Sequence, residues 1–97
     1  MPRQQEKNIV NAIIKMINAL PNSHARKTHG GMYSSGEPDI DAVVQGRAVK
    51  LEVKAPGGKA TPLQEARLRT WAHAGAVTGV VESVMEARVA LQAAGLV

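Results

Sequence analysis

The amino-acid sequence predicts a single α/β domain over residues 1–97, in the order helix, strand, strand, strand, helix, strand, helix. Three patterns indicate this class. Apolar residues recur at helical spacing near the N-terminus, two central segments alternate between apolar and polar residues, and capped helices flank a Val-rich segment in the C-terminal third. A chain of 97 residues can build only a modest core, so we also expect a homodimer.

Residues 3–20 have the pattern of an amphipathic helix that starts near Pro2 and ends before residues 21–23. Its apolar stripe consists of Ile9, Val10, Ile13, Met16, Ile17 and Leu20. Glu6 lies four residues before Val10 and so points toward the core side, where an unpaired carboxylate is costly. Alternatively, Glu6 sits at the exposed, positive end of the helix.

The middle of the chain predicts strands. Residues 24–29 are a weak candidate for the first strand, and residues 30–36 are a loop. Residues 39–44 and 49–54 then alternate with a period of two around a turn near Gly46. The apolar positions of these two strands are Ile40, Ala42, Val44, Val49, Leu51 and Val53.

The last third predicts a helix, a strand and a second helix. Thr61 is a natural N-cap for residues 61–74, with Pro62 in the first position and Glu65 close to the spacing of a capping box. We expect Leu63, Ala66 and Trp71 to face inward. Residues 77–81 are an apolar strand of the buried kind. Ser83 caps the final helix, whose residues available for burial are Val84, Ala87, Val89 and Leu91.

The charge balance favours an anionic partner. The net charge is +4 and the pI is near 9.9, with basic residues concentrated at 24–29 and 50–69. A basic surface around a central acidic cluster suits a polyanion, although an ordinary basic domain has the same balance. Tyr33 and Trp71 are the only aromatic residues, so a base-stacking platform for single strands is not expected.

The chain has no Cys, which excludes disulfides and thiolate metal ligands. Any metal ion would be held by oxygen atoms or by His24, His29 or His73. No apolar run approaches the ~20 residues of a membrane span, and the N-terminus lacks the apolar segment of a signal peptide. We therefore expect a soluble, cytoplasmic protein with no membrane partner.

The predicted hairpin gathers charged residues on its second face: Asp39, Asp41, Lys50, Glu52 and Lys54. Two registers keep the apolar face intact. A loop at residues 45–46 sets Asp39 opposite Glu52 and Asp41 opposite Lys50, whereas a loop at 46–47 sets Asp39 opposite Lys54 and Asp41 opposite Glu52. Opposed Cβ atoms lie about 5 Å apart, so two carboxylates could share a Mg²⁺ or Mn²⁺ ion. The alternative is a solvated sheet face with surface ion pairs.

The order Gly36-Glu37-Pro38-Asp39, then Glu52-Val53-Lys54 after the hairpin, resembles the PD-(D/E)XK motif of restriction-endonuclease-like nucleases. Further elements resemble the VRR-NUC branch of that superfamily: residues 27–31 (KTHGG), residues 52–56 (EVKAP) and residues 61–64 (TPLQ). The resemblance covers roughly residues 6–92. It implies an αβββαβα core with a mixed central sheet flanked by helices.

The resemblance also implies roles for individual residues. Asp39, Glu52, the Val53 carbonyl and Glu6 would bind the metal, with Lys54 as the catalytic lysine and Gln64 orienting the water or the lysine. Asp41 is not part of the motif. Lys27 would contact substrate phosphate. Further candidates for DNA contact, from the loops and the basic rim, are His29, Tyr33, Ser35, Lys59, Arg67 and Arg69.

The activity implied is that of a Mg²⁺- or Mn²⁺-dependent DNA endonuclease without an organic cofactor. The chain resembles the small stand-alone phage and bacterial forms, in which a homodimer places two active sites on a branched DNA such as a four-way junction. Two alternatives remain. One is a module of the same fold that binds nucleic acid without cutting, and the other is a nicking or restriction-like nuclease on linear duplex.

Overall fold

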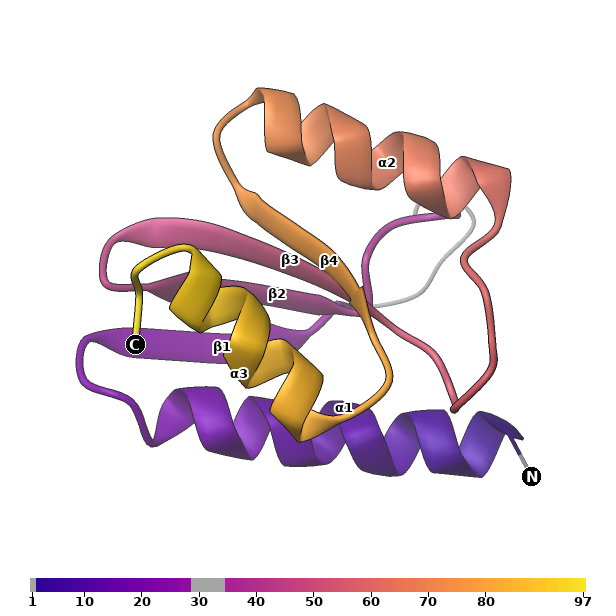
Figure 1. Ribbon diagram of the computed structural model, residues 1–97, viewed down its shortest axis with the longest axis horizontal. Coiled ribbons are helices and arrows are strands. Elements are labelled where there is room, and N and C mark those ends of the chain that lie inside the picture. The colour runs from indigo at the N-terminus through magenta and orange to yellow at the C-terminus, as the bar shows by residue number, and fades with distance from the viewer. Residues whose placement is uncertain (1, 29–34) are drawn as a thin grey trace.

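The structure is a computed structural model that describes residues 2–28 and 35–97. Its elements follow the predicted order (Figure 1). They are α1 (Pro2–Asn18), β1 (Ser23–Lys27), β2 (Ile40–Val44), β3 (Arg47–Val53), α2 (Pro62–His73), β4 (Val77–Val81) and α3 (Val84–Ala93). Within these ranges, no helix has the length and apolar character needed to cross a membrane.

The strands form one mixed sheet in the order β1-β2-β3-β4. The first three are antiparallel to their neighbours, and β4 runs parallel to β3. Helices α1 and α3 pack together on one face, and α2 lies over β3 and β4 on the other (Figure 1). This arrangement confirms the predicted α/β class with helices on both sides of a mixed sheet.

The core lies between the sheet and the helix pair α1 and α3. Helix α1 contributes Val10, Ile13 and Ile17, which are buried as their helical spacing predicts. The six apolar positions of β2 and β3 are at most 3% exposed. The opposite face of the hairpin is therefore left for the charged residues.

A two-residue turn fixes the hairpin register. Gln45 and Gly46 have φ of 52° and 81°, and two positive values are typical of a type I′ turn, which matches the twist of paired strands. Val44 consequently pairs with Arg47, and Asp41 with Lys50. The first of the two registers is the one that forms.

Three expectations about burial are wrong. Leu63 is 46% exposed and Leu68 is the buried residue of α2, because the helix turns a different side to the sheet. Val89 on α3 is 53% exposed. Strand β4 lies at the sheet edge with only Val81 buried, so it is not a fully covered strand.

Candidate functional site

Asp39 and Glu52 meet at the end of the hairpin away from its turn. Ile40 pairs with Leu51, so the next position outward sets Asp39 beside Glu52. The Val53 N–H donates to Asp39 Oδ2 at 2.8 Å, and the Thr28 N–H donates to the Asp39 carbonyl at 2.8 Å. Asp39 is thus held from both neighbouring strands.

Glu52 is a buried carboxylate, only 2% exposed. Its Oε2 lies 3.4 Å from Lys54 Nζ, whereas Oε1 is buried and accepts no hydrogen bond from the described residues. Burial first, and the negative charge of Asp39 second, raise the pKa of Glu52 to about 8 against the opposing effect of Lys54. Lys54 alone therefore does not keep the Glu52 carboxyl ionised at neutral pH, and a second cation bound beside it would favour the ionised form.

The pair fits a divalent cation. Two adjacent carboxylates, one with a buried oxygen that lacks a donor, form the hard-oxygen donor set that Mg²⁺ and Mn²⁺ prefer, and such ions usually keep several waters. No group of three or more His, Asp or Glu side chains gathers around one point within residues 2–28 and 35–97. The protein would therefore supply few ligands, with water or substrate completing the shell.

Glu6 lies at the edge of this site. It lines the same pocket as Asp39, and its Oε2 accepts a hydrogen bond from the Ala55 N–H at 3.3 Å. The structure thus brings Glu6 from α1 to the sheet end that carries the carboxylate pair. Its place as a metal ligand stays a prediction.

Lys54 immediately follows β3 and is fixed by a backbone hydrogen bond from its N–H to the Val81 carbonyl at 3.0 Å. Its side chain is 14% exposed and turns toward Glu52. A cation in this position can offset negative charge that develops beside the carboxylates.

Gln64 has a structural role in the helix cap. Its Oε1 accepts from the Thr61 N–H at 2.9 Å, and its own N–H donates to Thr61 Oγ1 at 3.1 Å. This is a complete capping box, and its third helical residue is Gln64 where the sequence spacing had suggested Glu65. The catalytic role of Gln64 remains a prediction.

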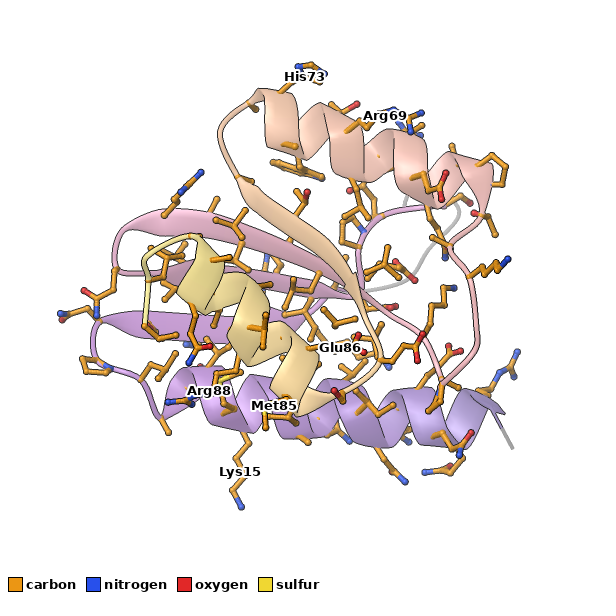
Figure 2. All side chains as sticks on the ribbon, in the orientation of Figure 1. Lys15, Arg69, His73, Met85, Glu86 and Arg88 are labelled. Atoms are coloured by element: carbon orange, nitrogen blue, oxygen red, sulfur yellow. The ribbon has the colours of Figure 1, made fainter. Side chains whose placement is uncertain are left out.

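The predicted DNA-contact residues are spread over the surface. Lys27 lines the pocket with Glu6 and Asp39, but Arg67 pairs with Glu37 at 3.7 Å. Arg69 extends outward from α2, away from the sheet (Figure 2). Lys59 and Ser35 are exposed, and His29 and Tyr33 lie outside the described residues.

Sequence reasoning missed the clamp that ties α2 to the loop before Asp39. The Trp71 indole N–H donates to Glu37 Oε2 at 3.1 Å, and Lys50 Nζ lies 3.9 Å from the centre of the Trp71 ring. Lys50 also pairs with Asp41. The sequence feature that could have indicated this contact is Trp71, the only Trp of the chain, which lies in the helix that follows the motif.

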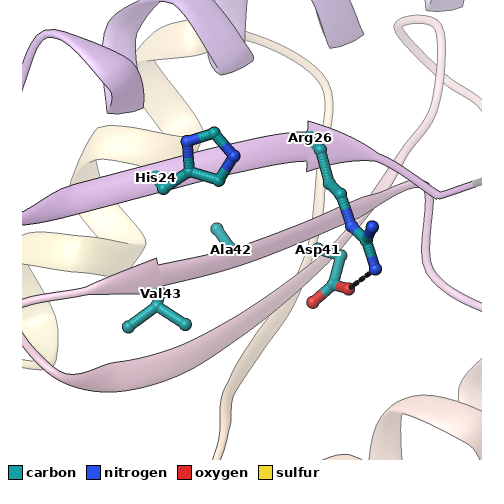
Figure 3. Close-up of a pocket in the computed structure, with 5 residues that line it drawn as sticks. All are labelled: His24, Arg26, Asp41, Ala42 and Val43. Carbon is teal, nitrogen blue, oxygen red and sulfur yellow. Dashed lines mark hydrogen bonds and ion pairs between the residues drawn. The ribbon is translucent and has the colours of Figure 1, made fainter.

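A second, shallower pocket opens on β1 and β2 (Figure 3). It encloses about 120 Å³ and is lined by His24, Arg26, Asp41, Ala42 and Val43. Arg26 Nη2 lies 3.4 Å from Asp41 Oδ2. The positive charge of Arg26 is therefore partly neutralised within the pocket itself.

Gly36 holds the start of the motif in place, and we expect Gly36→Ala to lower the free energy of unfolding. Its φ is +77°, and an added Cβ would lie 2.6 Å from Leu63 Cγ. Positive φ in a non-glycine residue costs about 1–3 kcal/mol, and the overlap with Leu63 adds to that. Urea denaturation followed by Trp71 fluorescence measures the loss.

Gly46→Ala is the matched control, because Gly46 has φ of +81° and no atom within 4 Å of an added Cβ. Its free energy of unfolding should fall only by the cost of the positive φ, because the added Cβ overlaps no other atom. Equal losses in the two variants would contradict the close approach of Leu63 to Gly36. Recovery in the Gly36→Ala, Leu63→Ala double variant would support it.

No family model matches this sequence, and neither does any curated protein compared with it. Solved structures do resemble it. One described as "VRR_NUC domain" superposes with a TM-score of 0.75 at 23% identity, over 91% of this chain and 95% of that one. Another, described as "VRR_NUC domain protein", gives 0.71 at 16% identity, over 90% and 84%. The chain therefore has the VRR-NUC fold, as the sequence predicted.

Proposed function

We propose that this protein is a Mg²⁺- or Mn²⁺-dependent endonuclease that hydrolyses phosphodiester bonds of branched DNA. The observation that carries the proposal is the pair formed by Asp39 and the buried Glu52, which has an oxygen that lacks a donor and lies 3.4 Å from Lys54 Nζ. The nuclease-family fold supports it independently.

In this proposal Asp39, Glu52 and the Val53 carbonyl hold the ion, and Glu6, which lines the pocket with Asp39, would have to move closer to join them as a further ligand. When bound, the ion supplies Lewis-acid polarisation of a phosphoryl oxygen and makes water a better nucleophile at neutral pH. The Val53 N–H holds Asp39 in position, at 2.8 Å from Oδ2. Lys54 donates to a phosphoryl oxygen and offsets the charge that builds on it as the bond to the leaving oxygen breaks. Gln64, at the start of α2, is proposed to orient the water or the lysine.

We further propose a homodimer in which α3 forms part of the interface. Met85 and Val89 are four residues apart on α3 and are 69% and 53% exposed. No large apolar residue of α1 with a described side chain is exposed to this degree. Of α1 and α3, the two helices on this face of the sheet, α3 therefore has the stronger support as part of the interface.

Cleavage of synthetic DNA tests this function. We expect a four-way junction to be cut with Mn²⁺ or Mg²⁺, and cutting to stop when EDTA removes the ion. Linear duplex and flapped DNA should be cut more slowly, and light scattering should give twice the mass of one chain. Binding of the junction without cleavage in either metal would indicate a non-cutting module instead. Equal cleavage of linear duplex would indicate a nicking or restriction-like enzyme.

A further inference from the structure

A pocket beside the carboxylate pair joins the start of α1 to the end of β1. It encloses about 280 Å³ and is lined by Arg3, Glu6, Lys7, Val10, Lys27 and Asp39. Four of these residues belong to α1 at spacings of three and four, so they share one side of the helix. Lys27 ends β1 and pairs with Ile40, the residue after Asp39. The two elements thus face each other across the pocket.

The pocket has more positive than negative side chains. It has three cationic side chains, those of Arg3, Lys7 and Lys27, and two carboxylates, those of Glu6 and Asp39. A divalent ion bound to Asp39 would increase the excess of positive charge. Among the described residues, the ion pairs within 4.0 Å involve Arg26, Lys50, Lys54 and Arg67. None of the three cations of the pocket therefore forms an ion pair within 4.0 Å with a carboxylate of the described residues.

The start of α1 adds to this field. The first turn of the helix contains no acidic residue, so the positive end of its dipole is not offset there. Arg3 offers a planar fork of donors that matches phosphate oxygens, and the lysines add mobile point charges. An anion with several oxygens is the ligand that this set recognises.

The size of the pocket limits the ligand. At about 280 Å³ it is below the ~300–1,000 Å³ of typical small-molecule sites. It has room for a single phosphate group with some ordered water. Asp39 on the pocket wall places that phosphate next to the candidate catalytic pair.

We propose that Arg3, Lys7 and Lys27 together bind one backbone phosphate of a DNA strand, adjacent to the phosphodiester bond presented to Asp39 and Glu52. This inference rests on the proposed function. It implies that the DNA strand runs past the start of α1. Because one phosphate is shared, removing any one cation weakens a contact on which the others also depend.

A double-mutant cycle of Lys7→Gln and Lys27→Gln tests the shared phosphate. Affinity for a four-way junction is measured by fluorescence anisotropy in EDTA, so that cleavage plays no part. We expect each single variant to weaken binding about tenfold, and the double variant by clearly less than the product of the two. The dependence of log K on log salt should become shallower by about 0.9 in each single variant, and no further in the double variant.

Lys15→Gln is the matched control. Lys15 belongs to the same helix, but its side chain points away from the fold (Figure 2). Its removal should leave the affinity within about twofold, as expected for a single screened surface charge. Losses for Lys7→Gln and Lys27→Gln no larger than that of Lys15→Gln would overturn the inference. Independent, multiplicative losses with a salt slope that falls at each step would also overturn it, since they indicate separate phosphates.

A second arm distinguishes a backbone phosphate from a terminal one. Junctions with and without 5′-phosphates should bind equally well, and the two lysine variants should affect both alike. An effect confined to phosphorylated ends would overturn the assignment to the strand backbone. Because binding is measured without metal, this test of the phosphate site does not depend on whether the protein cuts DNA. Failure of the inference and failure of the proposed function can therefore be told apart.

Discussion

Asp39→Asn is expected to reduce DNA cleavage by about a hundredfold to a thousandfold, the size of loss seen when one preorganised group that stabilises a transition state is removed. In the wild type the Val53 N–H donates to Asp39 Oδ2 at 2.8 Å. The Asn side chain keeps an oxygen that can accept this bond, so the structure of the hairpin end should be retained. Lys54→Met should have a comparable effect, because it keeps the apolar stem and removes the cation that lies 3.4 Å from Glu52. Single-turnover rates on a four-way junction in Mn²⁺ measure both losses.

Asp41→Asn provides the control for Asp39→Asn. Asp41 lies two residues further along the same strand face, but Lys50 and Arg26 bind it and lower its pKa. It therefore carries a surface ion network, and its amide variant should cut at close to the wild-type rate. Equal losses at Asp39 and Asp41, or full activity in Asp39→Asn, would refute the assignment. Unchanged circular dichroism and DNA affinity would show that the losses are chemical.

The order of elements was predictable because it rests on local periods. The alternation in β2 and β3 and the helical spacing in α1 depend only on which residues must leave water, and all six apolar strand positions are indeed buried. The register was not predictable, because both loops preserve that alternation. It depends on Gln45 adopting a positive φ of 52°, which few non-glycine residues do.

Burial in the C-terminal helices was harder to predict. Helix α2 is only weakly amphipathic, so the choice between Leu63 and Leu68 as its buried residue depends on how the helix docks on β3 and β4. Val89 was expected in the core and is 53% exposed, because Ala87 and Leu91 already face the sheet from α3. Which residues of these helices are buried depends on tertiary packing, and the sequence pattern of a short helix gives little indication of it.

For the candidate site, the sequence predicted the neighbours but not their environment. The pairing of Asp39 with Glu52 follows from one of the two registers. The nearly complete burial of Glu52 does not, because it depends on layers that pack from both sides of the sheet. Nor could spacing reveal that Gln64 caps its own helix or that Trp71 binds Glu37.

The burial of Glu52 leads to the second large effect, on stability against pH. Its pKa is raised from 4.5 to about 8 in the folded protein, by burial first and by Asp39 second. Between these values the folded state binds more protons than the unfolded state, so the free energy of unfolding falls as pH rises. At ~1.4 kcal/mol for each unit of pKa difference, the metal-free protein should lose about 3–5 kcal/mol between pH 5 and pH 8. Urea denaturation in EDTA, followed by Trp71 fluorescence, measures this loss.

Glu52→Gln isolates the cause, because the amide fills the same volume and cannot ionise. The variant should be nearly insensitive to pH in this window and more stable than the wild type at pH 8 without metal. A divalent ion opposes the loss in the wild type, since it binds the ionised carboxylates of the folded state and stabilises by RT ln(1 + [L]/Kd). Mg²⁺ or Mn²⁺ should therefore raise the urea midpoint of the wild type at pH 8 and leave that of Glu52→Gln almost unchanged. A wild-type midpoint that is flat between pH 5 and pH 8, or an equal response of both proteins to the ion, would contradict a buried, ionisable metal ligand at Glu52.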